Sequence, residues 1–488
     1  MANPIKKLAG DTAIYGLGTM VPRLLNYLLV PLYTILVFNE AQYGQITELY
    51  AYVAILLVIL TYGLETAFFR YANKDGDDLK VYNTAVSSLL ITSSLFLILV
   101  IIFLGDISIL LRYSGHHEYI LMIAIIVAID AFTALPFAWL RYTNKAKRFS
   151  IIRIISVATN ISFNLLFLVA LPKWFPQETS EMYFYQAGNK IVFVFIANVI
   201  GSLATLFMLW KELAIFRFSL DTVILKKLLS YGLPILVIGF AGMINEVADK
   251  ILLKYYLTDS ETAIEQIGIY GANYKLAILM MLFIQMFRFA AEPFFFAEAK
   301  KKDAKKTYAL VMNWFVIFTW FIFLGVTLFL DVFKYFIGPG FWAGLTIVPI
   351  ILAAKLFLGV FYNLSVWYKL TNKTLYGALI ALIGSAITII LNIILIPKYG
   401  YIGSAWANFA CYFSIMVISF LWGRRVYKIN YNLLKILSYS MLAVGIYYLS
   451  VFFGGNEKLI QLLINSIFMF AFISIVYVFE RNNLSLKD

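Results

Sequence analysis

The chain has 488 residues, of which 62% are hydrophobic and only 13% carry a charge. A typical soluble domain carries about twice that share of charged residues, and a water-soluble fold of this length cannot bury so much apolar surface. Composition therefore excludes a soluble enzyme and a disordered chain, and the single cysteine, Cys411, excludes a disulfide-stapled secreted protein. What remains is a protein that crosses a membrane many times.

Fourteen apolar stretches reach the length of about 20 residues that a helix needs to cross the hydrocarbon core. They are continuous, unlike the alternating ten-residue segments of a membrane β-barrel. Lys6 and Lys7 precede the first stretch, which lacks a small-residue cleavage site and is predicted to be a retained helix. In chain order the predicted spans are residues 12–37, 44–68, 83–104, 118–140, 149–171, 188–210, 229–256, 267–291, 307–330, 343–368, 374–396, 403–422, 433–453 and 457–479.

Lysine and arginine alternate between the two sides of these spans. The termini and even-numbered connections carry 26 of the 39 basic residues, the odd-numbered connections carry 6 and the spans carry 7, when Lys254, Lys435 and Lys458 at span ends are counted with the adjoining connections. Because basic residues collect on the cytoplasmic side, both termini are predicted to be cytoplasmic. The net charge of +13 is mostly this signal and requires no nucleic-acid partner. The prediction places Lys145, Lys301 and Arg424 inside, and His116, Lys173 and Asp259 outside.

The chain also contains an internal duplication. Trp139–Lys145 (WLRYTNK) matches Trp367–Lys373 (WYKLTNK) at an offset of 228. Further matches occur in the same order: Asn164 with Asn392, Glu65 with Glu292, Phe68-Phe69 with Phe295-Phe296, Tyr43-Gly44 with Tyr270-Gly271, and Tyr15-Gly16-Leu17 with Tyr231-Gly232-Leu233. The last pair has a shorter offset, and we assign the difference to a longer loop at residues 259–266.

Each repeat contains six predicted helices, and because six is even, the copies have the same orientation about an axis along the membrane normal. The predicted fold is an all-α polytopic membrane protein of about 14 transmembrane helices, with two parallel six-helix repeats around a central cleft. Residues 1–217 form the first bundle and residues 218–428 the second. Residues 429–488 add two helices and a short cytoplasmic tail. This is transporter architecture, although duplication could also serve only to build a stable bundle.

Ionisable side chains inside spans are costly and are functional candidates by default. Seven are basic and five acidic, and the cationic surplus suits an anionic substrate, since Arg binds phosphate as a fork and Lys as a point charge. Some have structural alternatives: side chains near span ends can snorkel to the surface, and Glu246 and Lys250 could neutralise each other one turn apart. The candidate substrate-binding cations are Arg23, Lys275, Arg288 and Lys355. The candidate ion-coupling acids are Asp130, Glu246, Asp249, Glu65 and Glu292.

Several kinds of catalytic motif are missing from the sequence. It contains no phosphate-binding glycine loop, no His-Glu-x-x-His, no Gly-x-Ser-x-Gly and no cluster of metal ligands. The longest predicted outer connection, residues 171–187, is too short to house a catalytic domain. We therefore expect neither enzymatic activity nor a bound cofactor or metal.

The N-terminal third resembles bacterial polysaccharide biosynthesis flippases, of the superfamily that includes multidrug and toxic compound extrusion (MATE) transporters and the lipid II flippase. The segments that carry the resemblance are Tyr15–Gly18 (YGLG), Arg23–Tyr27 (RLLNY), Pro31–Tyr33 (PLY), Tyr43-Gly44 and Thr61–Tyr71 (TYGLETAFFRY). The resemblance implies a MATE-like fold over essentially the whole chain, with Arg23 in a basic central cavity.

The implied function is to flip an undecaprenyl-pyrophosphate-linked oligosaccharide across the bacterial inner membrane by alternating access, for surface polysaccharide synthesis. Coupling to a proton or sodium gradient is expected. The expected partners are the lipid-linked substrate, membrane lipids and other polysaccharide-assembly proteins. Two alternatives stay open: a MATE-type drug/cation antiporter, and a membrane glycan polymerase or ligase.

Overall fold

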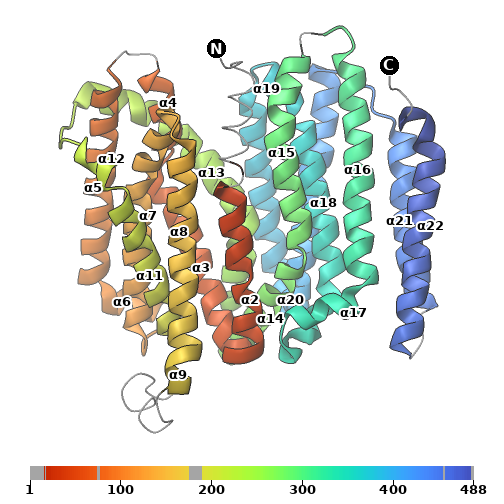
Figure 1. Ribbon diagram of the computed structural model, residues 1–488, viewed down its shortest axis with the longest axis horizontal. Helices are drawn as coiled ribbons and strands as arrows, with labels where there is room; N and C mark the ends of the chain where they lie inside the picture. Colours follow the sequence, from red (N-terminus) through yellow and green to blue (C-terminus); the bar gives the residue numbers. More distant parts are fainter. Residues whose placement is uncertain are drawn as a thin grey trace. The chain divides into compact units, whose positions relative to one another are not determined.

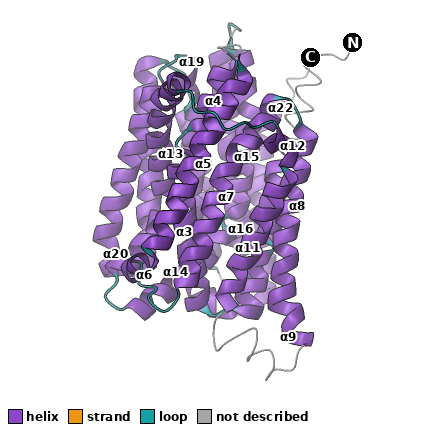
Figure 2. Cartoon of the chain, turned by 90° about the vertical axis from the view of Figure 1, so that its left-hand side faces the viewer, coloured by secondary structure: helices purple, strands orange, loops and turns teal. Residues whose placement is uncertain are grey.

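The computed structural model describes residue 16 and residues 18–73, 77–174, 190–299, 301–453 and 457–484. These residues form helices joined by short connections, and no strand occurs among them (Figures 1 and 2). Residues 12–15 and 17 of the predicted first span, and residues 175–187 of the predicted outer connection, lie outside the described residues.

Thirteen of the described segments are long and apolar enough to cross a membrane. The longest, Thr374–Val426, contains two helices that meet at Gly400, where φ is 56° and ψ is −137°. A side chain is strained in that conformation, so glycine permits the sharp reversal. This segment covers two of the predicted spans, which brings the observed set into agreement with about fourteen.

The chain divides into two compact units, which are described separately. The first combines residues up to Tyr33 with Gln45–Val247, and the second combines Thr34–Gly44 with Ala248 onward. The first unit contains residues of the first span with α2 (Leu29–Pro31), most of α3 (Glu40–Thr61), α4 (Leu64–Ala72), α5 (Asp78–Ile102), α6 (Leu104–Leu110), α7 (His117–Tyr142), α8 (Ala146–Leu165), α9 (Leu171–Trp174), α11 (Lys190–Met208), α12 (Trp210–Ala214) and most of α13 (Thr222–Tyr256). π-Helical turns occur at η1 (Leu32–Val37) and η2 (Leu166–Ala170).

The second unit contains most of η1, the start of α3 and the end of α13, followed by α14 (Ser260–Leu276) and α15 (Ile278–Glu298). It continues with α16 (Ala304–Leu328), α17 (Leu330–Phe333), η3 (Lys334–Phe336), η4 (Pro339–Ile347), α18 (Val348–Leu364), α19 (Val366–Leu370), α20 (Thr374–Val426), α21 (Leu433–Phe452) and α22 (Lys458–Leu484). The two C-terminal helices pack against each other and against α16 (Figure 1). The predicted division of the repeats at residues 217 and 428 stays a prediction.

The predicted loop at residues 259–266 is instead the first part of helix α14. Asp259 caps this helix by accepting a hydrogen bond from the backbone N–H of Glu261 at 3.2 Å, and a second one from the Thr262 hydroxyl. An aspartate before the first turn and a glutamate within it are typical of a helix start. The predicted eighth span, residues 267–291, is also interrupted, because the helix breaks at Ala277.

The duplicated heptapeptide adopts the same conformation in each unit. Asn144 and Asn372 both have φ of 56°, and asparagine tolerates this left-handed conformation at the end of a helix. Each is followed by a lysine whose backbone N–H donates over 2.8 Å to a carbonyl of the preceding helix. The sequence repeat is therefore also a repeat of local structure.

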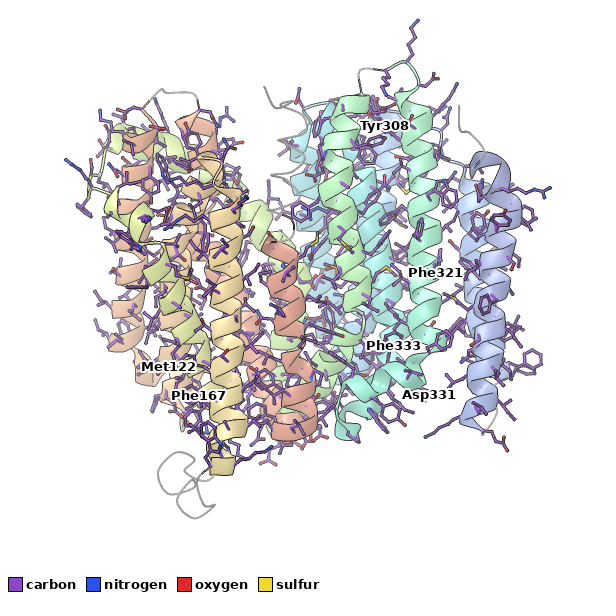
Figure 3. The ribbon with its side chains drawn as sticks, viewed as in Figure 1. Met122, Phe167, Tyr308, Phe321, Asp331 and Phe333 are labelled. Carbon is purple, nitrogen blue, oxygen red and sulfur yellow. The ribbon has the colours of Figure 1, made fainter. Side chains whose placement is uncertain are left out.

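Aromatic residues pack next to these turns. In the first unit the rings of Tyr82 and Trp139 lie 4.7 Å apart, beside Phe68. In the second unit Phe295 packs edge-on against Tyr308 at 5.2 Å. The Tyr308 hydroxyl donates to the Phe295 carbonyl at 2.8 Å and so joins α16 to α15 (Figure 3). Phe68 and Phe295 are the residues that the duplication pairs.

Candidate functional site

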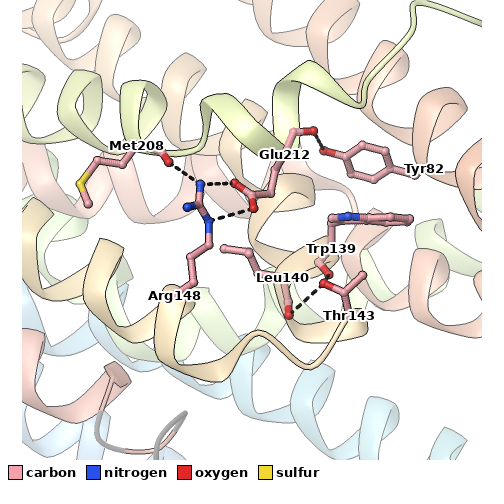
Figure 4. Close-up of polar contacts among 7 residues, drawn as sticks. All are labelled: Tyr82, Trp139, Leu140, Thr143, Arg148, Met208 and Glu212. Carbon is pink, nitrogen blue, oxygen red and sulfur yellow. Dashed lines mark hydrogen bonds and ion pairs between the residues drawn. The ribbon is translucent and has the colours of Figure 1, made fainter.

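A buried ion pair joins α8 to α12 in the first unit (Figure 4). Arg148 donates from Nε to Glu212 Oε1 at 2.9 Å and from Nη2 to Oε2 at 2.8 Å. The same Nη2 also donates to the Met208 carbonyl at 2.9 Å. Glu212 is only 1% exposed, and its own carbonyl accepts from the Tyr82 hydroxyl at 3.1 Å. The two-pronged contact of Arg148 with Glu212 holds the segment that follows α11 against α8. No motif in the sequence indicated this pair.

The predicted acids Glu65 and Glu292 form equivalent ion pairs in their two units. Glu65 accepts from Arg141, and Glu292 accepts from Lys369 Nζ at 2.5 Å. Arg141 and Lys369 occupy the same position of the duplicated heptapeptide. The duplication aligns both basic residues, but the sequence alone does not identify them as the partners of the two glutamates.

The predicted cation Arg288 lies beside this second pair. Its Nε is 3.9 Å from Glu292 Oε1, and its guanidinium lies 4.5 Å from the centre of the Tyr362 ring. These residues line a small pocket together with Lys369 and Ser365. The pocket has a volume of about 20 Å³, and its two cations and one carboxylate give it a net charge of +1.

Asp130, another predicted acid, lies in a polar layer of the first unit. It accepts from the Ser202 hydroxyl at 2.8 Å. One turn earlier on α11, Asn198 donates to the Tyr50 hydroxyl at 2.9 Å. Arg153 acts electrostatically on Asp130 and places its guanidinium 3.9 Å from the centre of the Phe137 ring. The structure thus brings a predicted acid near an intramembrane arginine.

The other predicted cations differ in exposure. Arg23 and Lys275 have exposed side chains. Lys355 is fully buried, with its Nζ 3.5 Å from the Tyr412 hydroxyl. A fully buried lysine cannot meet a large substrate in this conformation. Glu246 is partly buried.

Asp249 and Lys355 belong to a buried cluster that also contains Lys250, Tyr270, Tyr274 and Tyr412. Lys250 Nζ lies 3.0 Å from Asp249 Oδ1, and the Tyr270 hydroxyl donates to Asp249 Oδ2 at 2.6 Å. Both ammonium groups contact the Tyr274 ring. Lys250 Nζ lies 4.4 Å and Lys355 Nζ 4.8 Å from the centre of the ring. Lys250 thus forms an ion pair with Asp249, its neighbour in the sequence.

A large apolar groove lies in the second unit among α16, α18, α20 and α21. Its volume is about 800 Å³, and its 27 lining residues include Trp320, Phe357, Phe409, Met441 and Tyr448. None of these described lining residues is charged. The groove can therefore accept an extended apolar chain without burying a charge. Within the described part of the sequence, no group of three or more His, Cys, Asp and Glu residues could hold a metal ion.

Solved structures share this fold. The lipid II flippase MurJ, in an inward closed conformation, superposes with a TM-score of 0.73 and 18% identity, over 95% of this chain and 99% of the flippase. An inward-facing multidrug resistance MATE family transporter gives a TM-score of 0.59 and 14% identity, over 85% and 94%. A transporter of the same MOP superfamily from Pyrococcus furiosus gives 0.53 and 15%, over 86% and 94%. The MATE-like, all-helical fold predicted from the sequence is confirmed.

The family is defined by the sequence. Residues 8–299 match the family model described as polysaccharide biosynthesis protein, which is more than half of the chain. The chain therefore belongs to the polysaccharide biosynthesis protein family, as the resemblance implied. No curated protein sequence matches the chain significantly.

Proposed function

We propose that the protein flips an undecaprenyl-pyrophosphate-linked oligosaccharide across the bacterial inner membrane by alternating access, for surface polysaccharide synthesis. The apolar groove is the observation that carries this proposal. A polyprenyl tail is long and apolar, and an uncharged groove of about 800 Å³ can take it from the lipid without a desolvation cost. A small hydrophilic cation would gain nothing from such a groove.

The pyrophosphate of this substrate requires cations. Arg23 and Lys275 are exposed, and Arg288 lies in a pocket of net positive charge with Lys369 and Glu292. We assign these cations to the substrate headgroup. Lys355, which the sequence analysis placed with them, is fully buried and would reach the headgroup only in another conformation of the transport cycle.

We further propose that transport is coupled to a proton or sodium gradient through buried acids, with Asp130, Glu246, Asp249, Glu65 and Glu292 as candidates. Asp130 is supported by its polar layer and by nearby Arg153. Glu65 and Glu292 are engaged in ion pairs at equivalent positions, which suits a contact that breaks and reforms during transport. Both termini are cytoplasmic in this proposal, and other polysaccharide-assembly proteins are partners.

The proposal is tested with the purified protein in liposomes that contain a labelled undecaprenyl-pyrophosphate oligosaccharide. A membrane-impermeant reagent then measures the label in each leaflet. Transport is expected in the wild type, to be lost in Arg23→Ala and to be partly retained in Arg23→Lys, which keeps the charge. Lys147→Ala, an exposed basic residue on α8, is the control. Unchanged transport in Arg23→Ala would remove this residue from the site.

The groove is tested with two tryptophan variants of α21. Val444 lines the groove, whereas Leu449 is exposed and does not line it. Val444→Trp should slow transport of the lipid-linked substrate, and Leu449→Trp should not. The rival MATE-type function predicts instead that the vesicles export a cationic dye and do not move the lipid-linked substrate. That outcome would overturn the proposed function.

A further inference from the structure

The carboxylate of Asp249 is fully engaged by donors of the protein. Its Oδ1 accepts from Lys250 twice, from Nζ at 3.0 Å and from the backbone N–H at 2.8 Å. Its Oδ2 accepts from the Tyr270 hydroxyl at 2.6 Å. Asp249 is 1% exposed, Lys250 9% and Tyr270 0%, so these contacts lie inside the protein.

The surroundings of the Lys250 ammonium have the chemistry of a binding site for a monovalent cation. An oxygen of the Asp249 carboxylate lies 3.0 Å from the ammonium, and oxygen is the ligand that hard cations prefer. The faces of two tyrosine rings complete the environment, at 5.4 Å for Tyr270 and 4.4 Å for Tyr274. Aromatic rings attract metal and ammonium cations through the same electrostatic field.

We propose that the Lys250 ammonium is the resident cation of this site and closes the Asp249 carboxylate to sodium and other monovalent metal ions. The Lys250 ammonium repels a second cation at this buried carboxylate, because like charges interact strongly away from water. Lys355 adds a second ammonium 4.8 Å from the Tyr274 ring. The two ammonium groups thus contact the same ring, and each of them repels a further cation.

This inference rests on the proposed transport and limits which ion can drive it. If Lys250 occupies the site, sodium bound at Asp249 cannot be the coupling ion. The same inference also predicts how the site can be converted. Replacing Lys250 with methionine removes the ammonium and its positive charge. The carboxylate, the Tyr270 hydroxyl and the ring faces remain, so a sodium ion can occupy the vacated position.

The test measures thermal unfolding of the purified full-length protein in detergent, with sodium chloride exchanged for choline chloride at constant ionic strength. A ligand that binds only the folded state raises Tm in a concentration-dependent way. The wild type and Lys250→Arg, which keeps the charge, should show no rise specific to sodium. Lys250→Met should show a rise that saturates with sodium, and Asp249→Asn combined with Lys250→Met should lose it.

Several results would overturn the inference. One is a sodium-specific rise in the wild type that Asp249→Asn abolishes, since the site would then already bind the metal. Another is a folded Lys250→Met protein that sodium does not stabilise. Lys250→Gln serves as a second variant if the methionine variant fails to fold. If neither folds, direct binding of radioactive sodium decides: binding to the wild type but not to Asp249→Asn refutes the inference, and equal, non-saturable binding to both supports it. Thermal unfolding and sodium binding are measured without transport. A failure of this inference can therefore be told apart from a failure of the proposed function.

Discussion

The ion pair between Arg148 and Glu212 allows a quantitative prediction. Arg148→Ala removes the three hydrogen bonds that its guanidinium donates, two of them to a carboxylate that is 1% exposed. Glu212 then remains as an uncompensated buried charge. The perturbation should therefore destabilise the fold rather than act on the transported substrate.

Breaking a buried ion pair by removing one partner costs about 3–5 kcal/mol. The side chain of Arg148 is itself 29% exposed, so water can enter where the guanidinium was and solvate part of the carboxylate. We therefore expect a loss near the lower end, about 3 kcal/mol. The exposed pair of Lys306 with Asp303, at 86% and 73% exposure, is the matched control, and Lys306→Ala should cost no more than about 1 kcal/mol.

The assay is the free energy of unfolding in detergent. It is measured for Arg148→Ala and Lys306→Ala, and for Arg148→Met, Glu212→Gln and the double variant that combines these last two. The double variant removes both charges and should recover part of the loss, because no unpaired buried charge remains. If Arg148→Ala were no more harmful than Lys306→Ala, the ion pair of Arg148 with Glu212 would not be a stabilising element. A double variant less stable than the sum of its singles would also contradict the reasoning.

The remaining predictions concern topology, pH and coupling. With Cys411 replaced, cysteines at positions 145 and 301 should react with impermeant reagents only from the cytoplasm, and a cysteine at 116 only from outside; efficient outside labelling at 301 would contradict the fourteen-span topology. Hydrogen bonds from Thr262 and from the Glu261 backbone lower the pKa of Asp259. The stability that this cap contributes is therefore fully present above the unfolded pKa of about 3.9, and it is lost as pH falls through the lower pKa of the folded state. Unfolding measured between pH 6 and 3 should show this loss in the wild type and not in Asp259→Asn, where the amide still caps the helix. Flipping in liposomes should stop when every ion gradient is removed, and undiminished flipping there would indicate an uncoupled scramblase.

The sequence predicted the helical architecture well because membrane spans are defined by hydrophobic length alone. It also located the duplicated heptapeptide, whose left-handed asparagines the structure shows in both copies. It was wrong about the loop at residues 259–266, because hydropathy does not detect a helix with a polar first turn that a capping aspartate initiates. That residue was visible in the sequence, and capping rules could have identified the helix.

The site was predicted less completely, because partners that come from different helices leave no periodic signal. Glu65 and Glu292 were selected as isolated acids, whereas the structure pairs each with a basic residue 76 or 77 positions away. The repeat offered the one available clue, since both basic residues align when the copies are superposed. Burial could not be predicted either, so Lys355 was grouped with Arg23 although only Arg23 is exposed.

The reversal at Gly400 has a consequence for how the protein is made. The helices on its two sides meet without a polar loop, and the Gln266 side chain accepts from the Tyr401 backbone N–H at 3.0 Å. A connection this short gives the first helix no water-soluble tail to leave outside the bilayer while the second is being synthesised. We therefore expect residues 374–426 to enter the membrane together as a helical hairpin, with the Tyr401 N–H satisfied once Gln266 of α14 packs against the turn.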